Sequence, residues 1–192
     1  GQGQLACELA RRTELQIVCL VADAAAAQTL RRTLDAAGLY GARVTVEPMG
    51  TSDLPFPAYA ANLIVCDEVL STGQLPPCPP DLLRVLKPCG GTVLLGQPAG
   101  APKSIAAAAL QGWLPRSEQL RVEVPASAAG TWVRAVRGPL PGAGDWTHQY
   151  ADAAGTACSA DTLARAPFEL LWFGEPGPTK GVKGSMSPLS TG

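Results

Sequence analysis

The sequence predicts an α/β fold with a mostly parallel sheet that ends in an antiparallel hairpin. Continuous apolar runs occur at 15–21, 62–66 and 92–95, and such runs are typical of parallel strands buried on both faces. Stretches with leucines at helical spacing separate these runs. The alternating runs at 120–124 and 131–136, joined by PASAAG, predict the hairpin.

The first half of the chain predicts two strand–helix units. The run LQIVCLV at 15–21 is the first strand, and the helix after it places Leu30 and Leu34 on one face and ends at Gly38. The stretch 42–46 alternates like a strand, and a loop leads from it to the strand at 62–66.

The second half predicts shorter helices and an appended tail. Pro79 and Pro80 precede a helix at 81–87, a strand follows at 92–95, and a further helix is expected around 110–114. GPLPGAGD at 138–145 reads as a linker, and 146–192 predicts an irregular tail.

Composition narrows the possible partners. Lys and Arg total 15 and Asp and Glu total 16, so no excess charge favours nucleic acid or an anionic membrane. Six cysteines form no CxxC pair and His148 is the single histidine, which argues against structural zinc and any other metal site. No apolar run is long enough to span a bilayer.

Several segments in order carry a family resemblance: GQGQLACELA at the start, then DAAGLYG, DLPFP, NLIVCDE and LKPCGGTVLL. Residues 1–137 with these segments resemble class I S-adenosylmethionine-dependent methyltransferases. The resemblance implies a Rossmann-like methyltransferase sheet, N-terminally truncated because its first strand would precede Gly1. That strand belongs at the centre, so we expect a gap or a rearranged centre between the strands at 15–21 and 62–66.

The resemblance also implies a cofactor site for S-adenosylmethionine. Gly1 and Gly3 match the glycine turn that packs against the methionine part, although a tight turn opening a helix is an alternative explanation. The acid that binds the ribose hydroxyls falls on Val21. Asp23 is its substitute, but its place before a helix favours an N-cap.

Of the remaining site positions, one lacks the residue type that the family uses, and the others each have a competing role. Met49 stands where the family places an adenine-binding acid, and nearby Asp53 is the alternative, or else a solvated turn residue. Asp67 and Glu68 follow a strand at the edge where ligands bind in open α/β sheets. One of them is a candidate general base facing the methyl acceptor, and capping of the next segment is the competing role.

The tail has its own resemblance, carried by WTHQYADAAGTACSADTLARAPFELLWFGEPGP and SMSPLSTG. Residues 146–192 resemble the opening segment of pyrroloquinoline-quinone-type β-propeller proteins. Some bacterial proteins, planctomycete ones among them, join a methyltransferase-like domain to such a propeller, which implies a propeller partner and an extracytoplasmic location. We expect structural roles for His148, bonded to backbone, and for Trp146, filling the junction, and core roles for Trp172 and Phe173.

Three functions follow from these resemblances. The first is a methyltransferase with an unidentified acceptor, acting mainly by aligning donor and acceptor. The second is a non-catalytic scaffold for the propeller, favoured by the missing acids at Val21 and Met49. The third, a quinone-dependent oxidoreductase, fails for this chain because the opening segment alone cannot hold that cofactor.

Overall fold

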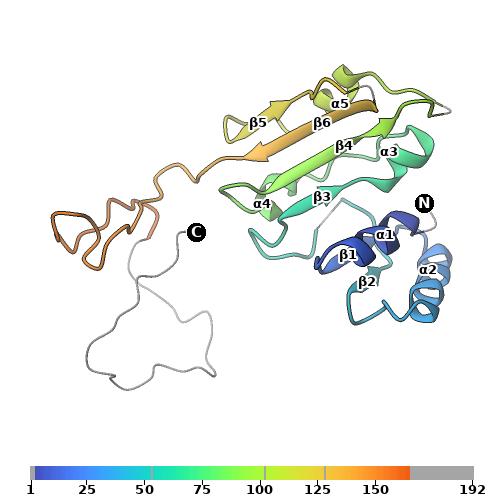
Figure 1. Ribbon diagram of the computed structural model, residues 1–192, viewed down its shortest axis with the longest axis horizontal. Coiled ribbons are helices and arrows are strands. Elements are labelled where there is room, and N and C mark those ends of the chain that lie inside the picture. The colour runs from blue at the N-terminus through green and yellow to red at the C-terminus, as the bar shows by residue number, and fades with distance from the viewer. Residues whose placement is uncertain (1–2, 53, 102, 128, 165–192) are drawn as a thin grey trace. The chain divides into compact units, whose positions relative to one another are not determined.

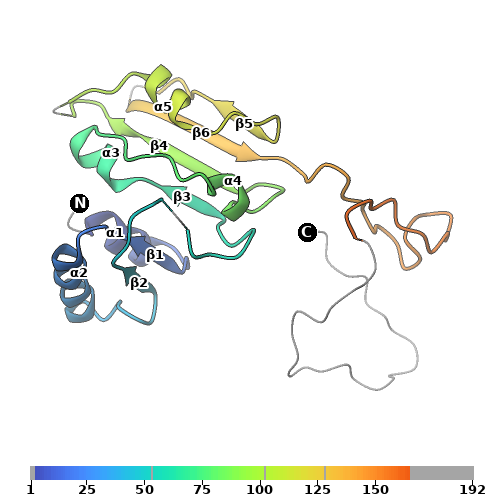
Figure 2. The ribbon, with the colours of Figure 1, turned by 180° about the vertical axis from the view of Figure 1, so that it is seen from behind.

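The computed structural model describes residues 3–52, 54–101, 103–127 and 129–164. The chain divides into two compact units, with the boundary after Gly138. Within the first unit, Figures 1 and 2 show two groups of elements, each with its own sheet and helices.

The first group contains a two-stranded parallel sheet. In chain order it consists of α1 (Gln4–Arg12), β1 (Ile17–Leu20), α2 (Ala24–Ala36) and β2 (Val44–Glu47). Val44 and Val46 of β2 are buried against Leu30 and Leu34 of α2, whereas the alternate β2 residues are exposed. The apolar–polar alternation of this strand therefore follows which face the helix covers.

The second group contains a four-stranded mixed sheet in the order β3-β4-β6-β5. Its members in chain order are β3 (Leu63–Val65), α3 (Asp67–Thr72), α4 (Leu82–Val85), β4 (Thr92–Pro98), α5 (Ala107–Trp113), β5 (Leu120–Glu123) and β6 (Gly130–Arg137). The strands β3 and β4 are parallel, and β6 is antiparallel to both β4 and β5. The predicted C-terminal hairpin is therefore confirmed, and its second strand is the one that joins β4.

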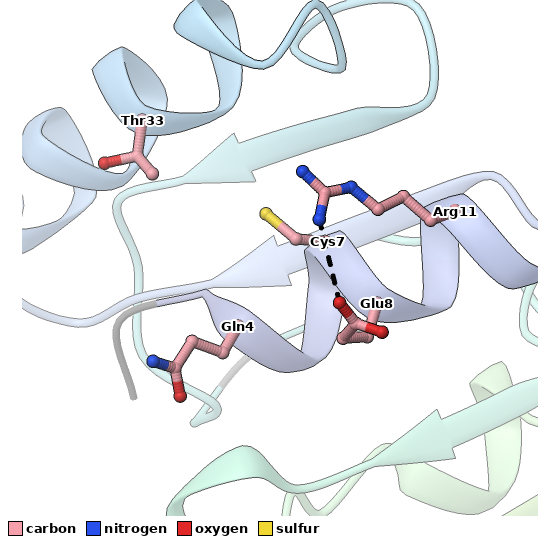
Figure 3. Close-up of a pocket in the computed structure, with 5 residues that line it drawn as sticks. All are labelled: Gln4, Cys7, Glu8, Arg11 and Thr33. Atoms are coloured by element: carbon pink, nitrogen blue, oxygen red, sulfur yellow. Dashed lines mark ion pairs between the residues drawn. The ribbon is translucent and has the colours of Figure 1, made fainter.

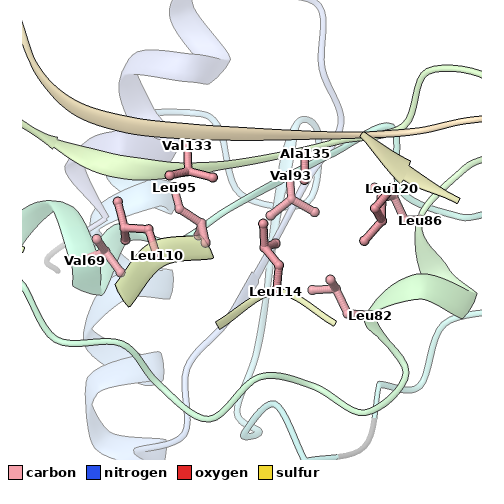
Figure 4. Close-up of a cluster of buried hydrophobic side chains, with 10 residues drawn as sticks. All are labelled: Val69, Leu82, Leu86, Val93, Leu95, Leu110, Leu114, Leu120, Val133 and Ala135. Atoms are coloured by element: carbon pink, nitrogen blue, oxygen red, sulfur yellow. The ribbon is translucent and has the colours of Figure 1, made fainter. Parts of the chain in front are cut away.

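One hydrophobic cluster holds the second group together (Figure 4). Val93 and Leu95 of β4 and Val133 and Ala135 of β6 alternate along their strands and point to one face of the sheet, where helices α3, α4 and α5 supply apolar partners. The buried members are Val69, Leu82, Leu86, Val93, Leu95, Leu110, Leu114, Leu120, Val133 and Ala135. Burial of such side chains stabilises each by about 1.5–3 kcal/mol.

The boundaries of α2 follow from its capping residues. The Asp23 carboxylate accepts a hydrogen bond of 2.7 Å from the Ala26 N–H, which satisfies one of the unpaired donors at the helix start. Gly38 has a φ of 68° and the Leu39 N–H reaches back to the Leu34 carbonyl, as in glycine-terminated helices. The predicted N-cap and the predicted glycine stop are both confirmed.

The expected gap in the sheet is also confirmed. Among the described strands, no ladder joins β1 to β3, and the two sheets remain separate. A complete sheet with a native central strand would have contradicted the prediction.

Several element boundaries differ from those predicted. The predicted strands at 15–21 and 62–66 shorten to β1 and β3, and the helix predicted at 81–87 shortens to α4. The predicted strand at 92–95 lengthens, because β6 pairs with β4 as far as Pro98. Helix α3 was not predicted at all, since its apolar content is too small to give a helical period.

The second unit is described as far as residue 164. Its one pairing is an isolated bridge between His148 and Ala151, and the His148 ring nitrogen Nδ1 lies 2.9 Å from the Thr147 hydroxyl, a side-chain partner and not the backbone partner expected. Trp146 is 42% exposed among the described residues, and its predicted role at a junction stays a prediction. Trp172 and Phe173 lie outside the described residues.

Candidate functional site

Two parallel strands of the first unit, β1 and β3, are each followed at the carboxyl end by the start of a helix, α2 after β1 and α3 after β3. Burial, and to a smaller extent the charge of the Asp67 carboxylate, raises the pKa of the Cys19 thiol to about 11. Carboxyl ends of strands are the usual ligand edge of an open α/β sheet. This edge is the candidate site.

Gly3 is the N-cap of α1 and adopts a φ of 78°. A Cβ atom on Gly3 would lie 2.1 Å from the Leu30 Cδ1 atom. The glycine is therefore required by the left-handed backbone and by the close packing of α1 on α2, independently of any ligand. Gly1 lies outside the described residues, and its predicted role remains a prediction.

The predicted ribose end of the site is only partly suited to its ligand. Val21 is half-buried and packs against the cluster of the first group, while one oxygen of the exposed Asp23 carboxylate is engaged in capping α2. Met49 is half-buried beyond the end of β2, and Asp53 lies outside the described residues.

Asp67 and Glu68 form the first turn of α3. Asp67 is half-buried and Glu68 is exposed. Carboxylates in a first helical turn are stabilised by the positive end of the helix dipole, but the N-cap is Cys66 and it makes no side-chain capping hydrogen bond, so the competing capping role of the pair stays a prediction. The same placement leaves the Glu68 carboxylate exposed to solvent at the candidate ligand edge.

A buried glutamine fixes the position of α3. The Gln97 amide nitrogen donates to the Val69 carbonyl and its oxygen accepts from the Ile105 N–H, each at 3.0 Å. Gly73 ends the helix at a φ of 67°, and a Cβ there would lie 2.6 Å from the Lys103 carbonyl oxygen. Sequence reasoning missed Gln97, because its partners lie 28 and 8 residues away with no local pattern to mark them.

A shallow hollow lies between α1 and α2 (Figure 3). The side chains of Gln4, Cys7, Glu8 and Arg11 line it from α1, and Thr33 lines it from α2. Arg11 and Glu8 form an exposed ion pair at 3.7 Å across its wall, which is worth little energetically. None of the predicted site residues lines this hollow.

Two negative findings apply to the described part of the chain. Within it, no group of three or more His, Cys, Asp or Glu side chains is arranged to hold a metal ion. Across the same residues, no helix has both the length and the apolar character needed to cross a membrane.

The raised thiol pKa of Cys19 gives a chemical prediction. Because the thiolate is the nucleophile, a pKa of about 11 in place of the ordinary 9.0 makes the thiolate about 100-fold scarcer near pH 8. We expect iodoacetamide to label Cys19 far more slowly than exposed Cys89 in the folded chain, as measured by peptide mass spectrometry over time. Equal rates in urea are the control, and equal rates in buffer would contradict the burial that raises the pKa of the Cys19 thiol.

The fold of the chain is that of methyltransferase structures. A protein named as a candidate S-adenosyl-L-methionine-dependent methyltransferase from Methanococcus maripaludis is similar with a TM-score of 0.57, at 17% identity over 73% of this chain and 74% of that chain.

The cyclase SpnF is similar with a TM-score of 0.52, at 16% identity over 73% of each chain. Identities this low show the fold alone, and the two names differ in reaction, so activity must be argued from the site. No protein-family model and no curated protein matches the chain.

Proposed function

We propose that residues 1–137 form an S-adenosylmethionine-binding, methyltransferase-like domain whose ligand edge is formed by the start of α1 and the start of α3. The observation that carries this proposal is the position of Asp67 and Glu68 in the first turn of α3, directly after β3, at the carboxyl ends of the parallel strands in a fold similar to that of methyltransferase structures. S-adenosylmethionine, when bound, supplies an electrophilic methyl group.

The start of α1 suits S-adenosylmethionine, whereas the ribose end of the site does not. The glycine turn at Gly3 leaves the α1 N-terminus free of a side chain, which suits close approach of a ligand. At the ribose end, Val21 offers no acceptor, and each missing charge-assisted hydrogen bond weakens binding by about 1.5–3 kcal/mol. The proposal therefore includes weak cofactor binding.

On the acceptor side, Glu68 is the residue placed to take a proton. Its carboxylate is exposed at the ligand edge, and a carboxylate can act as general base toward an oxygen or nitrogen nucleophile. Asp67 is half-buried and its charge helps to raise the pKa of the Cys19 thiol, so its role in the proposal is electrostatic.

Calorimetric titration of S-adenosylmethionine tests the proposal. We expect detectable but weak binding to the 192-residue chain, and about 10–100-fold tighter binding to the variant Val21→Asp, because the new carboxylate accepts hydrogen bonds from the ribose. Thr45→Asp, at an exposed position of β2, is the matched control and should leave affinity unchanged. Glu68→Gln should also leave affinity unchanged, since it acts on the acceptor.

The competing function is a non-catalytic scaffold. It is favoured by Val21 packing in a hydrophobic cluster and by Asp23 serving as a helix cap. No heat of binding to either the parent chain or Val21→Asp at millimolar ligand, with circular dichroism showing both folded, would establish the scaffold over the enzyme. The β-propeller partner implied for 146–192 and the extracytoplasmic location belong to this same proposal, and their support is the sequence resemblance alone.

A further inference from the structure

Strand β5 forms an outer edge of the four-stranded sheet (Figures 1 and 2), because among the described strands it pairs with β6 alone. The Gly138 N–H donates to the Gln119 carbonyl at 2.8 Å, and the antiparallel register of the two strands sets these residues opposite each other. In such a pair, residues that exchange backbone bonds alternate with residues that do not. Arg121 and Glu123 therefore also bond to β6, whereas the N–H and C=O groups of Val122 point to the open side of the edge.

Two valines at this edge leave apolar surface in solvent. Val122 is 38% exposed, and Val124, directly after the strand, is 45% exposed. Alternate residues of a strand share a face, so both valines lie on the face where Leu120 joins the hydrophobic cluster of the second group. The hydrophobic cluster therefore ends at the edge in side chains that remain partly exposed.

The opposite face of β5 carries one charge of each sign. The Arg121 and Glu123 side chains are 74% and 37% exposed, and they form an ion pair at 2.9 Å along the strand. Charges on an edge strand normally discourage pairing with another strand. Pairing with a copy of the same strand is an exception, because opposite charges can then face each other.

A second copy of β5, placed antiparallel about a two-fold axis at Val122, matches the residues of this edge. Val122 would exchange backbone bonds with its counterpart, and Leu120 would lie opposite Val124. Arg121 would lie opposite Glu123 in a pair without backbone bonds, where side chains approach most closely. A shift of two residues in either direction would set Arg121 opposite Arg121, or Glu123 opposite Glu123, and like charges directly opposite are destabilising. The order of the charges therefore selects one register.

We propose that the edge of β5 is a docking surface for a second copy of this chain, and that the two four-stranded sheets join through antiparallel β5 strands into one continuous sheet. The edge is complementary to itself, as an interface between identical subunits about a two-fold axis requires. The pairing strand is short, so the interface is smaller than a standard one and we expect a Kd of about 0.1–1 mM. The inference concerns assembly and does not depend on the proposed cofactor binding.

Two single charge reversals in the full chain test this inference. Arg121→Glu gives an edge with two acids, and Glu123→Arg gives an edge with two bases. Each variant alone sets like charges opposite each other, so we expect self-association at least about 10-fold weaker than that of the parent chain. An equimolar mixture restores both pairs of opposite charges, so we expect it to dimerise about as well as the parent. Sedimentation velocity between about 10 μM and about 1 mM measures these affinities.

The matched control mixes Arg116→Glu with Glu118→Arg. These substitutions change the net charge by the same amounts, at exposed positions before the strand, where the proposed register sets no charge opposite. We expect both control variants to self-associate as the parent does, alone and mixed. Circular dichroism checks that every variant is folded.

Amide hydrogen exchange followed by NMR locates the contact. We expect exchange at the Val122 amide to slow in proportion to the dimerised fraction, since this amide gains an acceptor. A parent chain that stays monomeric at about 1 mM would overturn the proposal. A mixture that associates no better than either charge-reversed variant alone would also overturn it, as would protection that arises on β2 and not at Val122.

Discussion

Replacing Arg137 with leucine is expected to lower the free energy of unfolding by about 3–5 kcal/mol, because the change leaves buried carbonyl groups without donors. The Arg137 side chain is only 5% exposed. Its Nη1 atom donates to the Leu83 and Leu86 carbonyls at 2.6 and 2.5 Å, and its Nη2 atom donates to the Gln119 side chain at 3.1 Å.

These bonds tie the end of β6 to the end of α4. The guanidinium thus satisfies carbonyls at a helix C-terminus, where a cation also interacts favourably with the dipole. It lies 5.1 Å from the ring centroid of Tyr59, within cation–π range. Among the described residues its buried Nε atom has no hydrogen-bond partner, so the guanidinium is held by its terminal nitrogens.

Urea unfolding followed by circular dichroism measures the effect. Arg137→Lys keeps the charge but not the fork of donors, so we expect a smaller loss of about 1–3 kcal/mol. Arg134→Leu, at an exposed position of the same strand, is the control and should change stability little. A loss below 1 kcal/mol for Arg137→Leu would show that water replaces the guanidinium at the carbonyls.

Replacing Gly3 with alanine is the second large expected effect, at about 2–4 kcal/mol of unfolding free energy. The φ of 78° disfavours any Cβ, and the new atom would meet Leu30 Cδ1 at a distance shorter than real contacts allow. The cost of the backbone conformation and the cost of the clash can be measured separately. The clashing atom belongs to the side chain of Leu30, which can be shortened by substitution.

A double-mutant cycle with Leu30→Ala performs the separation. The second substitution removes the obstructing methyl group but leaves the backbone conformation, so the cost of Gly3→Ala should fall to about 1–2 kcal/mol in the Leu30→Ala background. Gly112→Ala is the control, since nothing lies within 4 Å of its Cβ position. Strict additivity of the two changes would mean that α1 shifts away from α2.

Local signals allowed much of the fold to be predicted. Asp23 and Gly38 bound α2 because capping depends on neighbours in sequence, and those roles were correct. The gap between the two sheets was predicted from the family resemblance, because the first segment that resembles the family follows the family's first strand. The predicted strands at 15–21 and 62–66 are longer than β1 and β3. An apolar run indicates which residues are buried, but it does not show where hydrogen bonding between strands ends.

The residues that make long-range polar contacts were harder to find. Gln97 and Arg137 act on carbonyls of segments far away in the sequence, and a single polar residue in an apolar strand gives no sign of its partner. Gly3 was assigned to a cofactor turn, whereas its contact with Leu30 supplies a packing reason as well. The roles of Asp67 and Glu68 depend on a ligand, and they remain predictions.

The two hydrophobic clusters of the first unit share no residue, and this separation bears on cooperativity. One cluster draws its buried members from residues 6–46, and the other from residues 69–135. Regions with separate cores can open with separate free energies. A ligand that touches both Gly3 and Glu68 would stabilise the state in which both regions are closed. Occupancy of that edge would then couple two otherwise independent openings into a single transition.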